Sequence, residues 1–260
     1  MSRDAEFSDD DLLRYSRQIL LPGFELAGQQ ALRAARVLIV GAGGLGSPAT
    51  LYLAAAGVGA LTVVDPDVVE LSNLQRQIAH RTADVGRAKA ERAAEAAAAL
   101  NPQVTVRGIV ARVDERWLQA ELGTTAVPAF DCVLDCSDNF AARAAVNRAC
   151  HRTGVPLVSG AAIRMEGQLA VFDFRHARTP CYACLYGETG GEDEACVRNG
   201  VMAPLVGVIG AAQALAAIRL LAAYGDRAHG RLSLFDGLRG EWRQLRVTAD
   251  PACPVCAGAC

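Results

Sequence analysis

Val37-Leu-Ile-Val-Gly-Ala-Gly-Gly-Leu-Gly46 is the stretch that decides the fold of this 260-residue chain. Its first four residues are apolar without interruption, which is typical of a parallel strand buried on both faces. Gly41, Gly43 and Gly46 follow at the spacing of a nucleotide-binding turn, where they supply the turn, the approach to a phosphate and the close contact of the next helix. We therefore expect a nucleotide phosphate at this turn.

Asp65 closes a second apolar run, Leu61-Thr-Val-Val-Asp65, which we interpret as the next buried strand. A carboxylate about 20 residues after the glycines accepts hydrogen bonds from a ribose diol in such folds. The glycines and Asp65 alone also permit a nicotinamide-dependent oxidoreductase. None of the four histidines, however, lies in a motif typical of a hydride-transfer acid or base.

Apolar and amphipathic segments alternate up to residue 160, which predicts an α/β, Rossmann-like, mostly parallel sheet with ligands at the carboxyl ends of its strands. Two N-terminal helices precede this pattern. We expect helices at 8–18, 25–33, 44–56, 84–100, 114–122 and 140–153, and strands at 37–40, 61–65, 104–110, 130–136 and 156–160.

The pattern changes after residue 160. Residues 166–174 alternate as in an exposed edge strand, and residues 231–235 and 241–247 suit an antiparallel hairpin. No Pro/Ser-rich linker interrupts the chain, so we expect a single domain over 1–260. We divide it into N-terminal helices (1–35), a nucleotide-binding half (36–160) and a C-terminal half (161–260).

Composition limits the partners and the compartment. The net charge of −2 gives no reason to expect nucleic acid. The N-terminus is acidic and lacks the apolar core of a signal peptide, so we expect a cytoplasmic protein. Val201 to Ile218 is nearly all apolar, but its Gly and Ala content, Gln213 and the following Arg219 favour a helix of a soluble core or dimer interface over membrane insertion.

Two Cys-x-x-Cys pairs stand out among the nine cysteines: Cys181 with Cys184, and Cys253 with Cys256. This spacing lets two thiolates from one turn occupy two corners of a tetrahedron, so the two pairs predict a four-cysteine structural zinc site. Redox pairs or coincidental thiols are the alternative. A shared metal would hold the C-terminal tail against the body of the protein.

The other cysteines divide by context. Cys132, Cys136 and Cys150 lie in a predicted strand and helix, where buried inert thiols are expected. Cys196 lies in a polar, glycine-bounded loop next to Arg198, which favours neither a reactive thiol nor a bland surface residue over the other.

A polar loop after Asp65 and the starts of two predicted helices carry a further group of side chains, any one of which alone is most simply a solvated surface residue. Together they supply cations for phosphates, a carboxylate for Mg²⁺ and an amide for orientation, which favours a nucleoside triphosphate over a dinucleotide. The group comprises Asn73, Arg76, Arg87, Lys89 and Asp138.

At this point the chain resembles the ubiquitin-activating-like adenylyltransferases that include MoeB, ThiF and HesA. The resemblance covers nearly the whole chain, and Val158–Gln168 is more similar to the MoeB branch than to ThiF. It rests on both Cys-x-x-Cys pairs and on Arg14-Tyr-Ser-Arg-Gln-Ile-Leu-Leu-Pro22, Gly41-Ala-Gly-Gly-Leu-Gly46, Leu71-Ser-Asn-Leu-Gln-Arg-Gln77, Asp135-Cys-Ser-Asp-Asn139 and Met202-Ala-Pro-Leu-Val-Gly-Val-Ile-Gly210.

The resemblance implies adenylation by ATP of the C-terminal Gly-Gly of a ubiquitin-like sulfur carrier, and it makes 161–260 the carrier-binding half. Arg17 would reach the triphosphate from the second subunit of a homodimer, and Asp138 would hold Mg²⁺. In some relatives a cysteine at the position of Cys196 reacts with the carrier. The remaining implied nucleotide-binding residues are Gly41, Gly43, Gly44 and Gly46, Asp65 for the ribose, and Asn73, Arg76 and Lys89 for the phosphates.

The pathway stays open at this level. Sulfur would come from a separate donor, because no rhodanese-like segment follows the domain within these 260 residues. A MoaD-like carrier is favoured over a ThiS-like carrier or the carrier of a secondary pathway. A catalytically inactive scaffold is a further alternative, against which the presence of Arg17, Arg76, Lys89 and Asp138 speaks.

Overall fold

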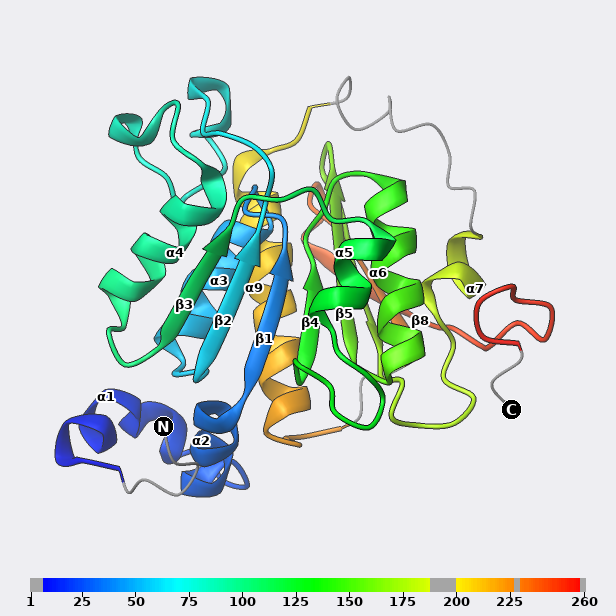
Figure 1. Cartoon of the computed structure of the whole chain (residues 1–260), viewed down its shortest axis with the longest axis horizontal. Coiled ribbons are helices and arrows are strands. Elements are labelled where there is room, and N and C mark those ends of the chain that lie inside the picture. Colours follow the sequence, from blue (N-terminus) through cyan, green and yellow to red (C-terminus); the bar gives the residue numbers. More distant parts are fainter. Residues whose placement is uncertain (1–6, 188–199, 227–229, 258–260) are drawn as a thin grey trace.

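The computed structural model describes residues 7–187, 200–226 and 230–257 and contains an eight-stranded mixed sheet in the order β3-β2-β1-β4-β5-β6-β7-β8 (Figure 1). The first five strands in this order run parallel, and the others join antiparallel. The strands are β1 (Arg36–Val40), β2 (Ala60–Val64), β3 (Thr105–Ile109), β4 (Cys132–Asp135), β5 (Leu157–Ile163), β6 (Glu166–Phe172), β7 (Arg231–Asp236) and β8 (Glu241–Arg246).

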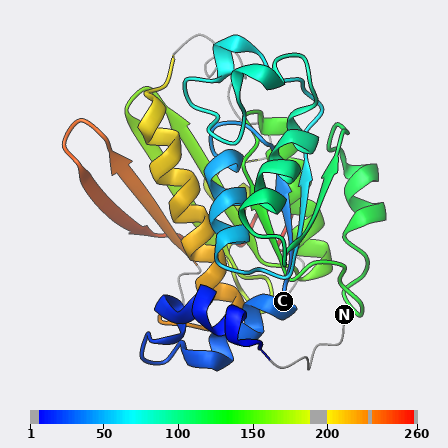
Figure 2. The ribbon, with the colours of Figure 1, turned by 90° about the vertical axis from the view of Figure 1, so that its left-hand side faces the viewer.

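Helices cover both faces of the sheet. One core includes residues of α3, α4 and α9, and a second core includes residues of α5, α6 and α7 on the other face. The β7–β8 hairpin projects beyond α9 at one edge (Figure 2). The helices are α1 (Asp9–Ile19), α2 (Glu25–Ala34), α3 (Gly46–Ala55), α4 (Lys89–Leu100), α5 (Glu115–Glu121), α6 (Phe140–Thr153), α7 (Tyr182–Tyr186) and α9 (Ala203–Leu221), with short 3₁₀ turns at Leu71–Asn73 and Thr82–Asp84.

The predicted fold class is confirmed. The strands are short, apolar and buried where the sheet is parallel: β1 shows four consecutive buried residues and β4 is buried throughout. Such burial follows from helices on both faces. The boundary placed at residue 160 falls inside β5, which pairs with β4 at one end and with β6 along its length. The parallel and antiparallel parts therefore form one continuous sheet.

The helix predicted from Asp84 begins instead at Lys89. Thr82–Asp84 forms a 3₁₀ turn, Gly86 adopts a φ of +87°, and Ala88 forms a bridge with Val68. A positive φ is incompatible with an α-helix, so the chain stays irregular until residue 88. Arg87 accordingly precedes α4, whereas Lys89 is its first residue.

The prediction that residues 166–174 form an exposed edge strand is wrong. β6 lies between β5 and β7, and its last three residues, Ala170, Val171 and Phe172, are buried. The edge is β8, all six residues of which are exposed. The 231–246 hairpin docks onto β6, and its sequence carries no signal for which strand it will join.

α9 is the one described helix long and apolar enough to cross a membrane, by length and composition only. It packs against α3, β5 and β6, and Leu205, Ile209 and Ala217 are buried there. A core helix of a globular fold has the same composition. Packing on the sheet thus accounts for the apolar run.

The N-terminal helices lie at the end of the sheet opposite the carboxyl ends of the parallel strands (Figure 1). Ser8 caps α1: its hydroxyl accepts from the Asp11 N–H at 3.2 Å, and the Asp11 carboxylate accepts from the Ser8 N–H at 3.0 Å. This reciprocal capping box fixes the start of α1.

Candidate active site

A cavity of about 970 Å³ opens at the carboxyl ends of β1, β2, β4 and β5. This is where parallel α/β sheets bind ligands, and the volume is at the upper end for a ligand pocket. The cavity has a charged region around the glycine turn and a second region over β5 and β6. Both regions belong to one continuous space.

The glycine turn joins β1 to α3 with almost no spare room. Gly41 has a φ of +97°, and a Cβ atom there would lie 2.7 Å from the Cys136 carbonyl oxygen. A Cβ on Gly46 would collide with the Gly41 carbonyl, and one on Gly44 would lie 2.9 Å from Val206 on α9. Gly43 and Gly44 line the cavity. Glycine at positions 41 and 46 is therefore required for the turn itself.

Asp65 follows β2, is buried and faces the turn. Its carboxylate accepts hydrogen bonds from the Ala42 N–H at 2.7 Å and from the Asp67 N–H at 2.8 Å. Burial raises the pKa of Asp65, and the two N–H donors and Lys89 oppose that rise. Each carboxylate oxygen keeps a further lone pair with which it can accept from a ribose hydroxyl.

Two predicted cations line the charged region. The Lys89 ammonium lies 3.0 Å from the Asp67 carboxylate, and only 9% of its side chain is exposed. Arg76 is half-buried and donates to the Ser72 carbonyl at 3.2 Å. Arg87 instead pairs with Glu95 at 3.1 Å and does not line the cavity. The phosphates of a nucleotide would therefore meet Arg76 and Lys89.

Asp138 is exposed at the loop between β4 and α6 and lines the cavity. Asn139 caps α6, since its side-chain oxygen accepts from the Ala142 N–H at 2.8 Å. The cap fixes where the helix starts, and thereby the position of the preceding Asp138.

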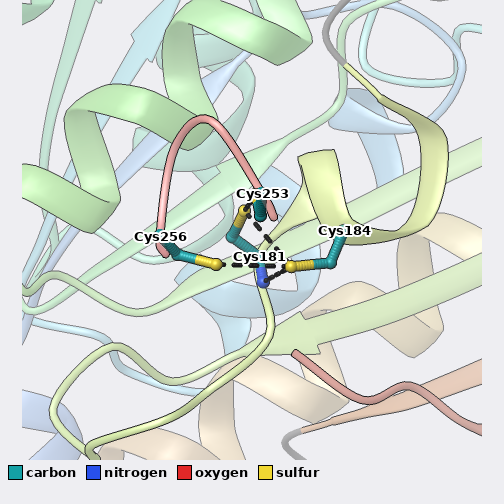
Figure 3. Close-up of side chains that lie close together, drawn as sticks. All are labelled: Cys181, Cys184, Cys253 and Cys256. Atoms are coloured by element: carbon teal, nitrogen blue, oxygen red, sulfur yellow. Dashed lines mark hydrogen bonds between the residues drawn. The ribbon is translucent and has the colours of Figure 1, made fainter. Parts of the chain in front are cut away.

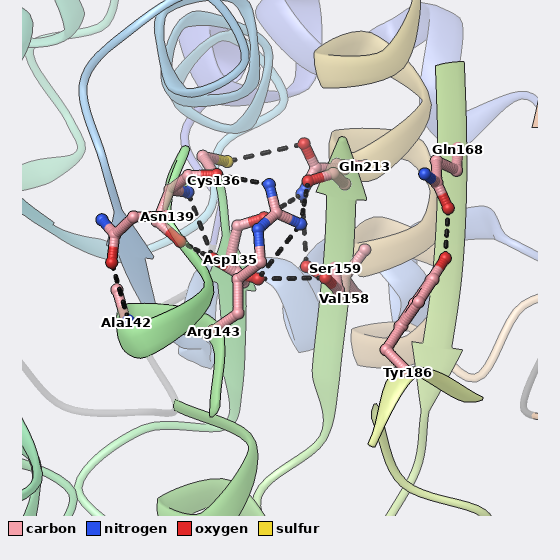
Figure 4. A network of polar contacts seen from close by, with 12 residues as sticks. Asp135, Cys136, Asn139, Ala142, Arg143, Val158, Ser159, Gln168, Tyr186 and Gln213 are labelled. Carbon is pink, nitrogen blue, oxygen red and sulfur yellow. Dashed lines mark hydrogen bonds and ion pairs between the residues drawn. The ribbon is translucent and has the colours of Figure 1, made fainter. Parts of the chain in front are cut away.

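A buried polar network under this loop was not predicted from the sequence (Figure 4). Asp135 accepts from the Ser137 hydroxyl at 2.6 Å and from the Ser159 hydroxyl at 3.0 Å. The Arg143 guanidinium donates to the Gly160 carbonyl at 3.0 Å and lies 3.9 Å from the Asp135 carboxylate. The network ties the ends of β4 and β5 to α6. The local sequence signal for this network is an Asp at position 135, directly after the apolar residues Val133 and Leu134.

Of the other described residues predicted for the nucleotide site, two do not line the cavity. Asn73 is buried, its amide lies 3.3 Å from the Ser72 hydroxyl, and it does not line the cavity. Arg17 is exposed on α1, at the opposite end of the sheet, and does not line the cavity. Cys196 falls outside the described residues.

The four paired cysteines converge, as the spacing predicted (Figure 3). Their sulfur atoms lie within 4.8 Å of one another, and neighbouring sulfurs are 3.3, 3.6 and 3.9 Å apart. These separations are too long for disulfides. A tetrahedral zinc site with Zn–S bonds of about 2.3 Å has edges of roughly 3.8 Å. The four thiols thus fit a closed structural metal site.

The local structure explains this convergence. Cys181 is the residue before α7, Cys184 lies within α7, and the 250–257 turns bring Cys253 and Cys256 against it. Burial raises the pKa of the Cys181 thiol to about 11. A bound cation would compensate the charge of the thiolates that this environment disfavours.

The remaining described cysteines agree with the prediction of inert thiols. Cys132, Cys136 and Cys150 are buried. Burial raises the pKa of Cys132 to about 12 and shifts the pKa values of Cys136 and Cys150 upward as well. Such thiols stay protonated and unreactive at neutral pH.

Comparisons with known proteins agree with this arrangement. A ThiF family model matches residues 15–255. The molybdopterin-synthase adenylyltransferase of Salmonella typhimurium is 49% identical over 252 residues, covering 97% of this chain and 99% of that protein. The sulfur carrier protein ThiS adenylyltransferase of Escherichia coli is 44% identical over 257 residues, covering 97% and 98%. Escherichia coli MccB, solved with ATP, shares the fold with a TM-score of 0.81 at 23% identity, over 98% of this chain and 75% of that one. The chain belongs to the ThiF family.

Proposed function

We propose that this protein uses ATP to adenylate the C-terminal Gly-Gly carboxylate of a ubiquitin-like sulfur-carrier protein, with a MoaD-like carrier favoured. The near full-length relatives named molybdopterin-synthase adenylyltransferase and ThiS adenylyltransferase support this reaction. The observation that carries it is the one cavity that joins the charged region around the glycine turn to a second region over β5 and β6. A group-transfer enzyme must bring its two substrates together in this way.

The charged region suits the nucleotide. Asp65 would accept from the ribose, the glycine turn would approach the phosphates, and Arg76 and Lys89 would neutralise them. Asn73 is kept in the proposed set as a residue that reaches the phosphates after a side-chain rearrangement, in which its NH2 group would exchange the 3.3 Å hydrogen bond to the Ser72 hydroxyl for one to a phosphate oxygen.

The region over β5 and β6 suits an extended glycine tail. Its lining includes the small residues Ser159, Ala161 and Ala170 of these two strands. Tyr182 and Tyr186 of α7 line it too, and the Tyr186 hydroxyl donates to Gln168 on β6. Larger side chains on the tail would meet this wall, whereas Gly-Gly would pass.

The reaction needs no protein nucleophile. A carboxylate oxygen of the carrier attacks the α-phosphorus, the bond from that phosphorus to the bridging oxygen breaks, and pyrophosphate leaves with the electron pair. The chain contributes positioning and charge neutralisation through Arg76, Lys89 and Arg17. Sulfur then reaches the acyl-adenylate from a separate donor.

Two metal ions complete the proposal. Asp138 would hold Mg²⁺, which neutralises charge on the phosphates when bound, and the exposed carboxylate on the cavity wall suits that role. Cys181, Cys184, Cys253 and Cys256 would hold a structural Zn²⁺. The closed four-thiol set leaves no ligand position for catalysis. We place the reaction in the cytoplasm, where thiols stay reduced.

We further propose a homodimer with two composite sites, in which Arg17 acts on the triphosphate held by the partner. Arg17 is exposed and far from its own cavity, which agrees with action on another chain. The domain division proposed above would then place 1–35 against the nucleotide-binding half of a second copy.

Mixing two inactive variants tests the composite site. Arg17→Ala and Asp138→Ala homodimers should each lose most activity, whereas a mixture that exchanges subunits should regain part of it, because one site per heterodimer has both groups. Carrier-dependent ATP–pyrophosphate exchange measures the recovery. No recovery despite proven subunit exchange would mean that each site is self-contained.

A panel of carriers tests the substrate. We expect ATP–pyrophosphate exchange with a MoaD-like carrier at lower carrier concentration than with a ThiS-like or secondary-pathway carrier. Exchange that depends only on a ThiS-like carrier would move the function to the alternative pathway. Tight NADH binding without ATP binding would instead favour the oxidoreductase, to which the relatives give no support.

A further inference from the structure

The peptide groups on both sides of Ala42, at the centre of the glycine turn, are held from within the protein. The Ala42 N–H donates to the Asp65 carboxylate at 2.7 Å. The Ala42 carbonyl oxygen lies 2.9 Å from Nε2 of His80, and the Ser47 hydroxyl donates to the same oxygen over a longer 3.4 Å. His80 follows the Leu71–Gln77 loop and is only 6% exposed. It was not predicted as a site residue.

The protonation of His80 follows from this geometry. A carbonyl oxygen can only accept, so Nε2 must carry the proton that faces Ala42. Nδ1 is buried and has no hydrogen-bond partner among the described residues. Burial lowers the pKa of His80, and the neighbouring Lys89 acts in the same direction, against the Ala42 contact and two carboxylates. The ring is therefore a neutral donor at Nε2.

The direction of the Ala42 carbonyl also sets the direction of the next N–H. In a planar trans peptide, the C=O of residue i and the N–H of residue i+1 point in opposite directions. Because the Ala42 carbonyl points inward to His80, the Gly43 N–H points outward. Gly43 lines the cavity. Within residues 7–187, 200–226 and 230–257, its N–H has no hydrogen-bonded acceptor.

The Ala42–Gly43 peptide can flip unless it is held from within the protein. Glycine tolerates positive and negative φ about equally, so rotation of the Ala42–Gly43 peptide meets little resistance at Gly43. The peptide before it is held differently: Asp65 takes the Ala42 N–H, and the Gly41 carbonyl packs against Gly46. Two hydrogen bonds to the Ala42 carbonyl oxygen oppose the flip, and the one from His80 is shorter than the one from Ser47.

We propose that His80 is a positioning residue for the nucleotide: it holds the Ala42–Gly43 peptide so that the Gly43 N–H donates to a phosphate of ATP. The inference rests on the proposed use of ATP. His80 touches neither substrate, since it acts through a backbone group.

Binding of ATP and of adenosine to the full-length protein tests this role. His80→Leu should weaken ATP binding by about 10-fold or more, because a hydrogen bond to a charged acceptor is lost. Adenosine has no phosphate, so its affinity should not change. His80→Gln places an amide N–H near the position of Nε2 and should restore most of the ATP affinity. Titration calorimetry of the wild type and of both variants measures these affinities.

His151→Leu is the matched control. His151 lies on α6, packs edge-on against Phe174 with 5.3 Å between ring centres, and does not line the cavity. The His151→Leu protein should bind ATP with the same affinity as the wild type. Equal loss of ATP and adenosine affinity in His80→Leu would overturn the inference, because it would indicate general damage to the site.

The backbone amide resonance of Gly43 gives a second measurement that needs no folded variant. In the wild type we expect this resonance to shift downfield on ATP binding and to stay in place with adenosine. No shift with ATP would overturn the inference while leaving adenylation intact. A wild-type protein that binds no ATP would overturn both this inference and the proposed function.

Discussion

Asp138→Ala is expected to lower carrier-dependent ATP–pyrophosphate exchange by about 100- to 1000-fold, the usual effect of removing one electrostatic group from an active site. Asp138 lines the cavity and belongs to the loop fixed by the Asn139 cap. The loss should be in the rate at saturating ATP. Asp138→Asn should show a similar loss, because the amide keeps the size but not the charge.

Asp226→Ala is the control for this prediction. Asp226 is exposed, lies outside the cavity and accepts from Arg219 through its backbone carbonyl, which the substitution keeps. Its exchange rate should equal that of the wild type. An Asp138→Ala protein with wild-type exchange at saturating Mg²⁺ would contradict the role given to this carboxylate.

Cys184→Ser is expected to release the bound metal and to unfold the C-terminal tail. Structural zinc sites contribute an apparent free energy of about 10–16 kcal/mol in small zinc domains, so three remaining thiols should not hold the tail in place. Metal analysis should give no zinc in the variant and one ion per chain in the wild type. The midpoint of thermal unfolding should fall.

Cys132→Ala separates this effect from the general cost of losing a buried thiol. Cys132 lies in β4 and is no part of the four-cysteine cluster. Its zinc content should match that of the wild type, although its stability should fall modestly because of the cavity left behind. Unchanged zinc content in the Cys184→Ser protein would contradict the assignment of a zinc site to the four cysteines.

The parts of the site encoded in short stretches could be predicted from the sequence. The glycine turn is one, because Gly41 needs a positive φ and Gly46 needs the absence of a Cβ, and both needs leave a local mark. The cysteine cluster is another, because each Cys-x-x-Cys pair marks half of a tetrahedron on its own. Their separation in sequence does not weaken either signal.

Contacts between segments distant in the sequence could not be predicted, because they correspond to no local sequence motif. His80 acts on Ala42 across 38 residues, and Arg143 reaches Gly160 from another element. The sequence around His80 and around Arg143 contains no motif that indicates the residue each one contacts. The same limit explains β6, whose interior position depends on where the 231–246 hairpin docks. Gly86, by contrast, is a local signal that α4 starts only after it. The prediction of a helix from Asp84 gave more weight to the Ala-rich run that follows.

Mass spectrometry of the carrier tests the central claim most directly. After incubation with this protein, ATP and Mg²⁺, a MoaD-like carrier should gain the mass of one AMP residue at its C-terminal glycine, and pyrophosphatase should increase the yield. The adduct should not form on a carrier that lacks its final glycine. No adduct on any intact Gly-Gly carrier, under conditions where the protein is folded and binds ATP, would contradict the proposed function.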